Sequence, residues 1–566
     1  MSGEKRSHVE DVKVGSQALR GNLTTELQRD SDHFVEDDTV VLKHHGIYQQ
    51  DDRDARARAR GTAAAKVYSF MVRCKIPGGG LTGAQYLALD DISTRYADGT
   101  VRITTRQDIQ FHGIFKRNLK KGMRAINESL VTTLGACGDV VRNFMACPAP
   151  LADRARARIQ EHALALTERL LPRGRAYHEV WLDGERVETA PGVPEEPFYG
   201  EVYLPRKFKV GLAFPGDNCI DVFSQDVGIV PVLAGDALES FVILVGGGLG
   251  KTHNKAETFP RLADAFATVE PDALGATVEA IVAVQRDHGN RANRRRARLK
   301  YLIEEWGLAR FRTAVEGQLG RTLAPPAPLT WPATDDHLGW HRQPDGHWFL
   351  GVWIENGRVK DTAESRAKTA FQTLLKRLPA NVRLTAQQNI LFTDVAPAAR
   401  GEVDAILRDH GIALAETLPM ARRHSMACPA IPTCGLAVAE AERVFPDVVR
   451  QLEGVLRDLG LEGERLSMRM SGCPNGCSRP FIGDIGFVGR TLNKYQVYVG
   501  GDFAGTRLNT LYADMVATDR LADTIRPLLA LFAARRHSGE EFGNFCNRLG
   551  VDELRRLAPL PEEVTQ

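Results

Sequence analysis

The chain has 566 residues, and this length by itself predicts several domains, roughly four. Apolar residues make up 43% and charged residues 25% of the chain, as in ordinary globular proteins. The 73 Lys and Arg residues nearly balance the 71 Asp and Glu residues, so the net charge of +2 excludes the overall basic field that favours nucleic-acid binding. The polar start and the lack of a run of about 18 apolar residues predict neither a signal peptide nor a membrane span.

The first 63 residues are polar and charged. They include the run Asp51-Asp52-Arg53-Asp54, which is followed by Arg56, Arg58 and Arg60. By composition alone, this region is predicted to be a solvated N-terminal arm.

Two segments of the chain recur at one fixed separation. Residues 101–109 (VRITTRQDI) resemble residues 382–390 (VRLTAQQNI), and residues 145–149 (MACPA) are repeated at 426–430, both at an offset of 281. A single offset shared by two separated matches indicates an internal duplication. We therefore expect an α+β (mixed α/β) fold of two related halves around a pseudo-twofold axis, with the binding cleft between them.

Several cations of the first half lie on segments that look extended. Alternate side chains of a strand share a face, so Arg102 and Arg106 are expected on one side, and Lys207 and Lys209 next to each other. Two neighbouring ammonium groups repel each other in a dry cleft unless an anion lies between them. The alternative is an ordinary solvated face.

The middle of the chain contains a predicted helix at 261–285, a basic run at 291–298 and a proline-rich linker at 324–328. Residues 246–252 (GGGLGKT) resemble a phosphate-binding loop, but Val245 stands where that motif requires a glycine. We interpret this loop as a closely packed backbone segment. We therefore expect no nucleotide to bind at this loop.

Four cysteines of the second half form two close pairs, Cys428 with Cys434 and Cys473 with Cys477. Between the pairs, residues 436–460 are helical in character and residues 466–470 alternate like a strand. Four soft thiolates can hold an iron–sulfur cluster or zinc, and the C-x5-C and C-x3-C spacings favour the cluster over zinc or no metal. Such clustering also indicates a reducing compartment, so we expect a cytoplasmic protein.

The other five cysteines are scattered along the chain, which favours buried apolar positions. They are Cys74, Cys137, Cys147, Cys219 and Cys546. Cys147 is the counterpart of Cys428 in the duplication. Because the first half has no C-x3-C pair, we interpret Cys147 as a relic and not as a ligand.

The order C-x5-C…C-x3-C, with Met-Ala before Cys428 and GCPNGC at 472–477, resembles the siroheme sulfite and nitrite reductases. The resemblance implies that the four cysteines bind a [4Fe-4S] cluster and that Cys477 is also the axial ligand of siroheme iron. Residues 45–54 (HGIYQQDDRD) are similar to a segment found in the haemoprotein (beta) subunits of bacterial assimilatory NADPH-sulfite reductases. This similarity implies an arm that packs on the body of the protein or on a partner.

The same resemblance implies roles for polar side chains. Siroheme carries eight carboxylates, which guanidinium groups and other hydrogen-bond donors can hold. The residues implied in cofactor binding are Arg102, Arg106, Gln110, His112 and Asn475, besides Cys477. The residues implied in holding sulfite during catalysis are Arg73, Arg142, Lys207 and Lys209.

The resemblance implies a three-lobed protein with four parts. These are the arm at 1–63, a paired ferredoxin-like repeat domain at 64–140 and 335–415, a first siroheme- and substrate-binding lobe at 141–334, and a second lobe at 416–566 that carries the cluster. It further implies an assimilatory sulfite reductase of cysteine biosynthesis, which reduces sulfite to sulfide with six electrons. The expected donor is an NADPH-dependent flavoprotein subunit with FAD and FMN, and ferredoxin is the alternative.

Two rival functions remain. One is a ferredoxin-dependent nitrite reductase that forms ammonia, although the pair Lys207 and Lys209 favours sulfite in this family. The other is a zinc-binding scaffold without enzymatic activity, associated with RNA through residues 291–298.

Overall fold

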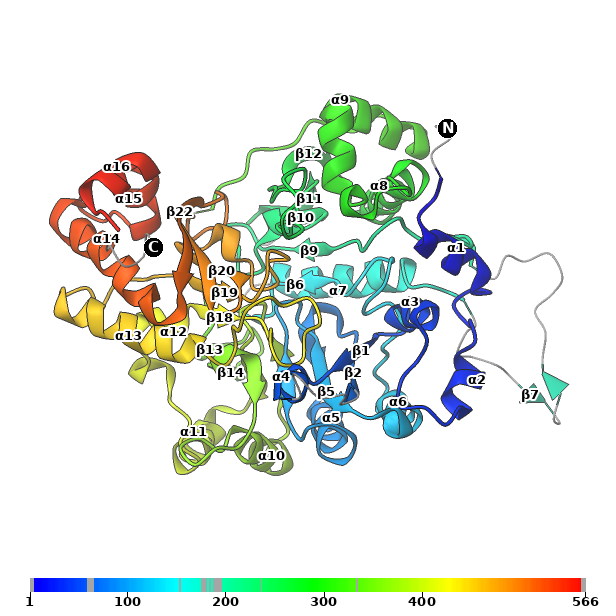
Figure 1. Ribbon diagram of the computed structural model, residues 1–566, viewed down its shortest axis with the longest axis horizontal. Helices are drawn as coiled ribbons and strands as arrows, with labels where there is room; N and C mark the ends of the chain where they lie inside the picture. The colour runs from blue at the N-terminus through cyan, green and yellow to red at the C-terminus, as the bar shows by residue number, and fades with distance from the viewer. Residues whose placement is uncertain are drawn as a thin grey trace.

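The computed structural model describes residues 5–58, 66–151, 154–174, 181–182, 185–186, 196–235, 237–331 and 334–560. The predicted arm boundary at residue 63 lies outside these ranges. Figure 1 shows three groups of elements: a base of sheets and helices, a lobe with α8 (Leu274–His288) and α9 (Leu299–Leu319), and a lobe that carries the C-terminus.

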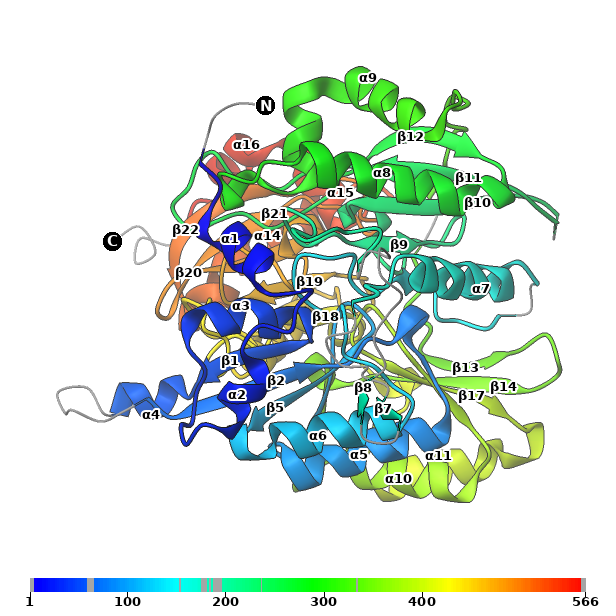
Figure 2. The ribbon, with the colours of Figure 1, turned by 90° about the vertical axis from the view of Figure 1, so that its right-hand side faces the viewer.

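The base contains two related five-stranded sheets. The first has the order β1 (Ile47–Asp51), β2 (Tyr68–Arg73), β5 (Ile109–Ile114), β4 (Val101–Ile103), β15 (Arg358–Val359). The second has the order β13 (Gly339–Arg342), β14 (Trp348–Val352), β17 (Ile390–Val395), β16 (Asn381–Leu384), β3 (Gly80–Leu81). Four helices, α5 (Gly83–Tyr96), α6 (Lys116–Glu128), α10 (Ala367–Arg377) and α11 (Arg400–Asp409), lie together below these sheets in Figure 2.

The two sheets of the base exchange their last strands. The short strand β3 belongs to the first half in sequence but pairs with β16, and β15 belongs to the second half but pairs with β4. Close approach of the backbones requires glycine before each exchanged strand. A Cβ atom on Gly79 would overlap with the carbonyl oxygen of Leu384, and one on Gly357 would overlap with that of Ile103, the residue equivalent to Leu384. The halves are thus interlocked.

The two lobes also contain equivalent sheets. One has the order β12 (Asp264–Val269), β11 (Ala237–Val245), β10 (Val227–Ala234), β9 (Val210–Leu212), β6 (Met145–Ala146). The other has the order β18 (Ser425–Ala427), β19 (Met468–Ser471), β20 (Ile485–Thr491), β21 (Lys494–Val499), β22 (Thr510–Ala517). Val227 pairs with Val210, and Ile485 pairs with Met468, in parallel ladders of the same register. The predicted mixed α/β fold with an internal duplication is confirmed.

Helices cover the outer face of each lobe. Beside α8 and α9, the first lobe has α7 (Arg154–Arg169), which lies near the base in Figure 2. The C-terminal lobe has α13 (Phe445–Asp458), α14 (Leu521–Arg535), α15 (Phe542–Leu549) and α16 (Val551–Leu557). None of the helices in the described part of the chain is long and apolar enough to cross a membrane.

The N-terminal region is folded and not a solvated arm. It forms α1 (His8–Gly15), α2 (Leu23–Gln28), α3 (Glu36–His44), β1 and α4 (Arg53–Arg58). Strand β1 pairs with β2 along its whole length, from Ile47 with Val72 to Asp51 with Tyr68. The composition misled because a few apolar side chains anchor the segment, among them Phe34, which is 1% exposed.

Two helix predictions need correction. Helix α13 begins only at Phe445, so residues 436–444 are not helical, although Pro446 lies in its first turn as predicted. The stretch 261–285 contains strand β12 before α8 begins at Leu274. Pairing of β12 with β11 from Phe241 and Val269 onward outweighs the local preference for helix.

Candidate cofactor and oxyanion site

The four cysteines of the second half meet where β18 and β19 end. Cys428 follows β18, Cys434 lies in the next turn, and Cys473 and Cys477 lie in the loop after β19. All nine cysteines are described, and Cys477 alone among them is exposed. Burial, and after it the proximity of the Cys477 thiol, raises the pKa of Cys473 to about 12. Burial also raises the pKa values of Cys428 and Cys434, so a cation is needed to hold these thiols as thiolates.

The surroundings of these sulfurs suit an iron–sulfur cluster. The backbone N–H of Gly472 donates to Cys428 Sγ at 3.3 Å, and the side-chain amide of Asn475 donates to Cys473 Sγ at 3.4 Å. Hydrogen bonds to sulfur stabilise the negative charge of a cluster and tune its potential. The residues present therefore fit a [4Fe-4S] cluster.

A buried ion-pair network positions Cys428. The carbonyl of Ala427 accepts hydrogen bonds from Arg102 Nη2 at 2.8 Å and from Gln388 Nε2 at 3.1 Å. The N–H of Glu442 donates to the Cys428 carbonyl at 3.1 Å, and the Glu442 carboxylate pairs with both Arg102 and Arg358. Arg102, predicted to bind a siroheme carboxylate, is thus engaged by Glu442 in this structure.

A basic cavity of about 340 Å³ opens next to the cysteine loop. Lys207, Lys209, Cys473 and Asn475 line it together, so the alternation of residues 207–209 places both ammonium groups in one cavity as predicted. Within the described part of the chain, neither Nζ atom has a hydrogen-bond or ion-pair partner. Burial, and then the charges of Arg142 and Arg206, lower the pKa of Lys207 well below its usual value. An anion in the cavity would favour the charged ammonium group and so raise this pKa again.

Arg73 and Arg142 are the other two residues of the predicted sulfite clamp. Arg73, Lys207 and Lys209 each interact electrostatically with the Cys477 sulfur, so all three lie around it. Arg73 pairs across the strands with Gln110, whose amide oxygen, when turned toward it, accepts from Nε at 3.0 Å. Arg73 Nη1 also donates to Cys137 Sγ at 3.2 Å.

Arg142 is already engaged by the protein. Its Nε and Nη2 donate to the carbonyl of Gly138 at 3.3 and 3.1 Å, and its Nη2 donates to the hydroxyl of Tyr48 at 3.5 Å. Arg142 is also not among the described residues that line the cavity. Arg142 nevertheless adds positive potential there, because it is among the charges that lower the pKa of Lys207.

Two further predicted residues lie in different surroundings. Strand β4 ends at Ile103, and Gln107 adopts a φ of 57° in the turn that follows, so Arg106 does not share a strand face with Arg102. Arg106 Nη1 donates to Gln225 Oε1 at 3.0 Å. His112 is buried, and its Nδ1 lies 3.1 Å from Arg358 Nη1.

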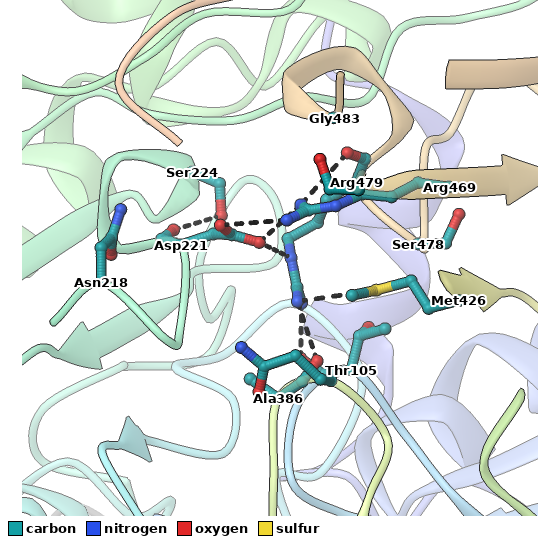
Figure 3. Close-up of polar contacts among 12 residues, drawn as sticks. Thr105, Asn218, Asp221, Ser224, Ala386, Met426, Arg469, Ser478, Arg479 and Gly483 are labelled. Atoms are coloured by element: carbon teal, nitrogen blue, oxygen red, sulfur yellow. Dashed lines mark hydrogen bonds and ion pairs between the residues drawn. The ribbon is translucent and has the colours of Figure 1, made fainter. Parts of the chain in front are cut away.

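One guanidinium group, that of Arg479, joins the two halves (Figure 3). Arg479 Nη1 donates to the carbonyl of Thr105 at 2.9 Å, and Nη2 donates to that of Ala386 at 2.8 Å. These two carbonyls are equivalent at the offset of 281, so Arg479 lies on the pseudo-twofold axis. Asp221 accepts from Arg479 Nε and, at 2.7 Å, from Arg469 Nη1.

Several positively charged side chains that line the cavity were not predicted. They are Arg206, Lys251, Arg294, Arg295, Arg298 and Arg479. Arg206 directly precedes Lys207, and the run 291–298 was visible in the sequence but suggested RNA. In the structure, Arg291 pairs with Glu10, Arg294 with Asp139, and Arg298 with Asp226 at 2.6 Å.

The glycine-rich loop at 246–252 packs against the cysteine loop. The N–H of Lys251 donates to the carbonyl of Pro474 at 2.9 Å, and a Cβ atom on Gly250 would lie 2.8 Å from the carbonyl oxygen of Asn475. A phosphate-binding loop would be followed by a helix, and the residues between β11 and β12, all of which the structure describes, form none.

The family assignment agrees with this geometry. Residues 163–323 and 421–565 match the nitrite and sulphite reductase 4Fe-4S domain, and residues 64–129 and 341–410 match the nitrite/sulfite reductase ferredoxin-like half domain. The chain belongs to the nitrite and sulfite reductase family. Its matched segments occur in pairs, which confirms the duplication and the predicted relationship to the siroheme enzymes.

Relatives of known activity cover nearly the whole chain. It is 44% identical over 574 residues to a "Sulfite reductase [ferredoxin]" of Synechococcus elongatus, covering 98% of this chain and 91% of that protein. It is 44% identical over 543 residues to a "Sulfite reductase [NADPH] hemoprotein beta-component" of Acidithiobacillus ferrooxidans, covering 96% of each. The structure of the Mycobacterium tuberculosis NirA protein superposes with a TM-score of 0.79 at 26% identity, over 97% of this chain and 98% of that one.

Proposed function

We propose that this protein is an assimilatory sulfite reductase that reduces sulfite to sulfide with six electrons. The observation that carries the proposal is the pair of unpartnered ammonium groups, Lys207 and Lys209, in a cavity lined by the cluster cysteine Cys473. Sulfite is a small dianion, and two ammonium groups that line one cavity are stabilised when an anion lies between them. The cysteine loop would hold the cluster that supplies electrons, and the lysine pair would bind the oxyanion. Both line the same cavity.

The residues of the site have distinct roles in this proposal. Cys428, Cys434, Cys473 and Cys477 hold the [4Fe-4S] cluster, and Cys477 also holds siroheme iron. When bound, these groups supply the electrons and the iron centre for the reduction of sulfite. Lys207 and Lys209 bind and orient the sulfite oxygens, and they stabilise the charge that develops as each oxygen is protonated and leaves as water.

Arg73 and Arg142 contribute in another way. Each already donates hydrogen bonds to the protein, so they are proposed to assist the clamp through the positive potential that they add around the lysines. Arg106, Gln110, His112 and Asn475 are proposed to face the siroheme periphery. Arg102 is proposed to exchange part of its ion pair with Glu442 for a cofactor carboxylate.

We further propose that electrons arrive from an NADPH-dependent flavoprotein with FAD and FMN. The segment HGIYQQDDRD at residues 45–54 supports this through its similarity to the NADPH-type haemoprotein subunits, and it forms the partly buried strand β1 and the start of α4. The relatives divide between donors, since one is named for ferredoxin and another for NADPH. Ferredoxin is therefore the competing donor. The two are separated by supplying the reconstituted protein with each in turn and measuring sulfide.

The function is tested by kcat/KM for sulfite and for nitrite with a chemical one-electron donor, so that no partner is needed. Preference for sulfite is expected. Preference for nitrite would move the chain to the nitrite branch of the family while leaving the cysteine site in place. No turnover of either substrate, in protein that contains iron and acid-labile sulfide, would overturn the proposal.

A further inference from the structure

A second cluster of metal-binding side chains lies in the first half. Cys147, Asp217, Cys219 and His337 are buried, and their ligand atoms all lie within 4.8 Å of one another. Cys147 Sγ is 3.9 Å from both Asp217 Oδ2 and His337 Nε2, and these last two atoms are 3.2 Å apart. Tetrahedral zinc, with bonds of about 2.0 Å to N or O and 2.3 Å to S, requires ligand separations of roughly 3.3–3.8 Å. The four side chains are thus already close to that geometry.

Two of these residues occupy the positions of cluster ligands. Cys147 corresponds to Cys428 at the offset of 281. The matching registers of β9 with β10 and of β19 with β20 give a second offset of 258, at which Cys219 corresponds to Cys477. The hydrogen bonds agree, since the N–H of Cys147 donates to Leu212 O at 3.1 Å and the N–H of Cys428 donates to the equivalent Met470 O at 3.2 Å.

The other two ligands of a cluster are missing from this half. Pro215 stands at the position equivalent to Cys473, and the position equivalent to Cys434 is Asp153, which lies outside the described residues. Asp217 and His337 come in their place, one from the loop after β9 and one from the segment before β13. A set of two thiols, one imidazole and one carboxylate no longer suits a cubane cluster, but it suits a single zinc ion.

The protein holds each of these ligands in place. The second oxygen of Asp217, Oδ1, accepts from the N–H of Asp335 at 3.1 Å, and the N–H of His337 donates to Asp335 Oδ1 at 2.8 Å. The carbonyl of Cys219 accepts from Gln387 Nε2 at 2.6 Å. In known metal sites, such hydrogen bonds orient the side chains that bind the metal.

The charge of the site also suits a divalent cation. Two thiolates and one carboxylate carry three negative charges, and a zinc ion would leave one. Arg156, whose Nη2 lies 3.9 Å from Asp217 Oδ2, offsets that remaining charge.

We propose that Cys147, Asp217, Cys219 and His337 bind a structural zinc ion that joins the first lobe to the start of the second half. The ion would tie β6, the loop after β9 and the segment before β13 together. This site is separate from the cysteines of the proposed reductase site, so the inference does not depend on the proposed function. It also revises our interpretation of Cys147 as a relic without a ligand role.

The test is metal analysis of the holoprotein, purified without chelators from zinc-supplemented cells. About one zinc per chain is expected beside the iron, with X-ray absorption showing two sulfur and two nitrogen or oxygen neighbours. The Cys219→Ser and His337→Gln variants should each lower zinc to less than about one fifth of the wild-type content. Their iron content should stay unchanged, which also shows that these variants fold.

Two controls keep the outcome interpretable. Cys546→Ser removes a buried thiol of the other lobe and should keep the zinc. Cys434→Ser removes a cluster ligand and should lower iron while keeping zinc, which excludes zinc in the cluster site. A wild-type protein without zinc, zinc retained in both Cys219→Ser and His337→Gln, or a disulfide between Cys147 and Cys219 detected by thiol counting and mass would each overturn the proposal.

Discussion

Arg479 and Asp221 occupy equivalent positions of the two lobes, 258 residues apart, and they form an ion pair with each other at the pseudo-twofold axis. After duplication, one position became an arginine and the other an aspartate. Arg469, which is 6% exposed, adds a second guanidinium to the same carboxylate. One buried contact therefore links both lobes to the turns at Thr105 and Ala386 (Figure 3).

Replacement of Asp221 by Asn should strongly destabilise the fold. The change leaves two buried guanidinium groups without their carboxylate, and breaking a buried pair costs about 3–5 kcal/mol. The free energy of unfolding by urea measures the effect. Asp514→Asn is the matched control, because Asp514 faces Arg490 at 3.9 Å and both side chains are partly exposed, so its loss should cost less than about 1 kcal/mol. Equal effects of the two variants would refute the role of Asp221.

Replacement of Lys207 or Lys209 by Met should impair sulfite reduction. Each ammonium group is expected to contact the oxyanion, and removal of one such group should lower kcat/KM roughly 10²–10³-fold. Lys251→Met is the control, because Lys251 lines the same cavity but already donates to the hydroxyl of Tyr498 at 3.1 Å. Its kcat/KM should change much less. A similar loss in all three variants would indicate a general field effect and not a specific clamp.

Replacement of Cys473 by Ala should remove the cluster. A cubane that lacks one thiolate ligand is poorly held, so the purified variant should lose most of its iron and its visible absorption. Iron and acid-labile sulfide per chain provide the measurement. Cys546→Ala, which removes a buried thiol from α15, should keep both at the wild-type level. If Cys473→Ala kept its iron, the assignment of the tetrad would be wrong.

The Glu442 network should make stability depend on pH in the acid range. Burial by itself raises the pKa of Glu442, but Arg102 and Arg358 outweigh it and lower the pKa to about 2, from the usual 4.5. Since the folded pKa lies below the unfolded one, the stabilising contribution is complete above pH 4.5 and is lost as the pH falls toward 2.

The measurement compares wild type with Glu442→Gln. At pH 7 the variant should be less stable by about 3 kcal/mol, since a shift of one pKa unit corresponds to about 1.4 kcal/mol. The difference should shrink as the pH falls from 4.5 toward 2. A difference that stays constant over this range would show that the charge of Glu442 contributes nothing. Loss of iron from the variant at pH 7 would further show that the network positions Cys428.

The sequence by itself determined the features that depend on local spacing. The cysteine tetrad, the pairing of Lys207 with Lys209 and the duplication at the offset of 281 could all be read from short segments, because a turn or a strand fixes the relation between near neighbours. Pro446 likewise marked the start of α13. The family followed from the same segments.

The tertiary structure alone decided what lies far apart in sequence. The partner of Arg102 is Glu442, 340 residues away, and strands β3 and β15 exchange between halves. The equivalence of Cys219 with Cys477 was hidden because insertions changed the offset from 281 to 258. His337 comes to Cys147 and Cys219 from another segment of the chain. Such contacts are set by how sheets pack around the axis, and no local propensity encodes that packing.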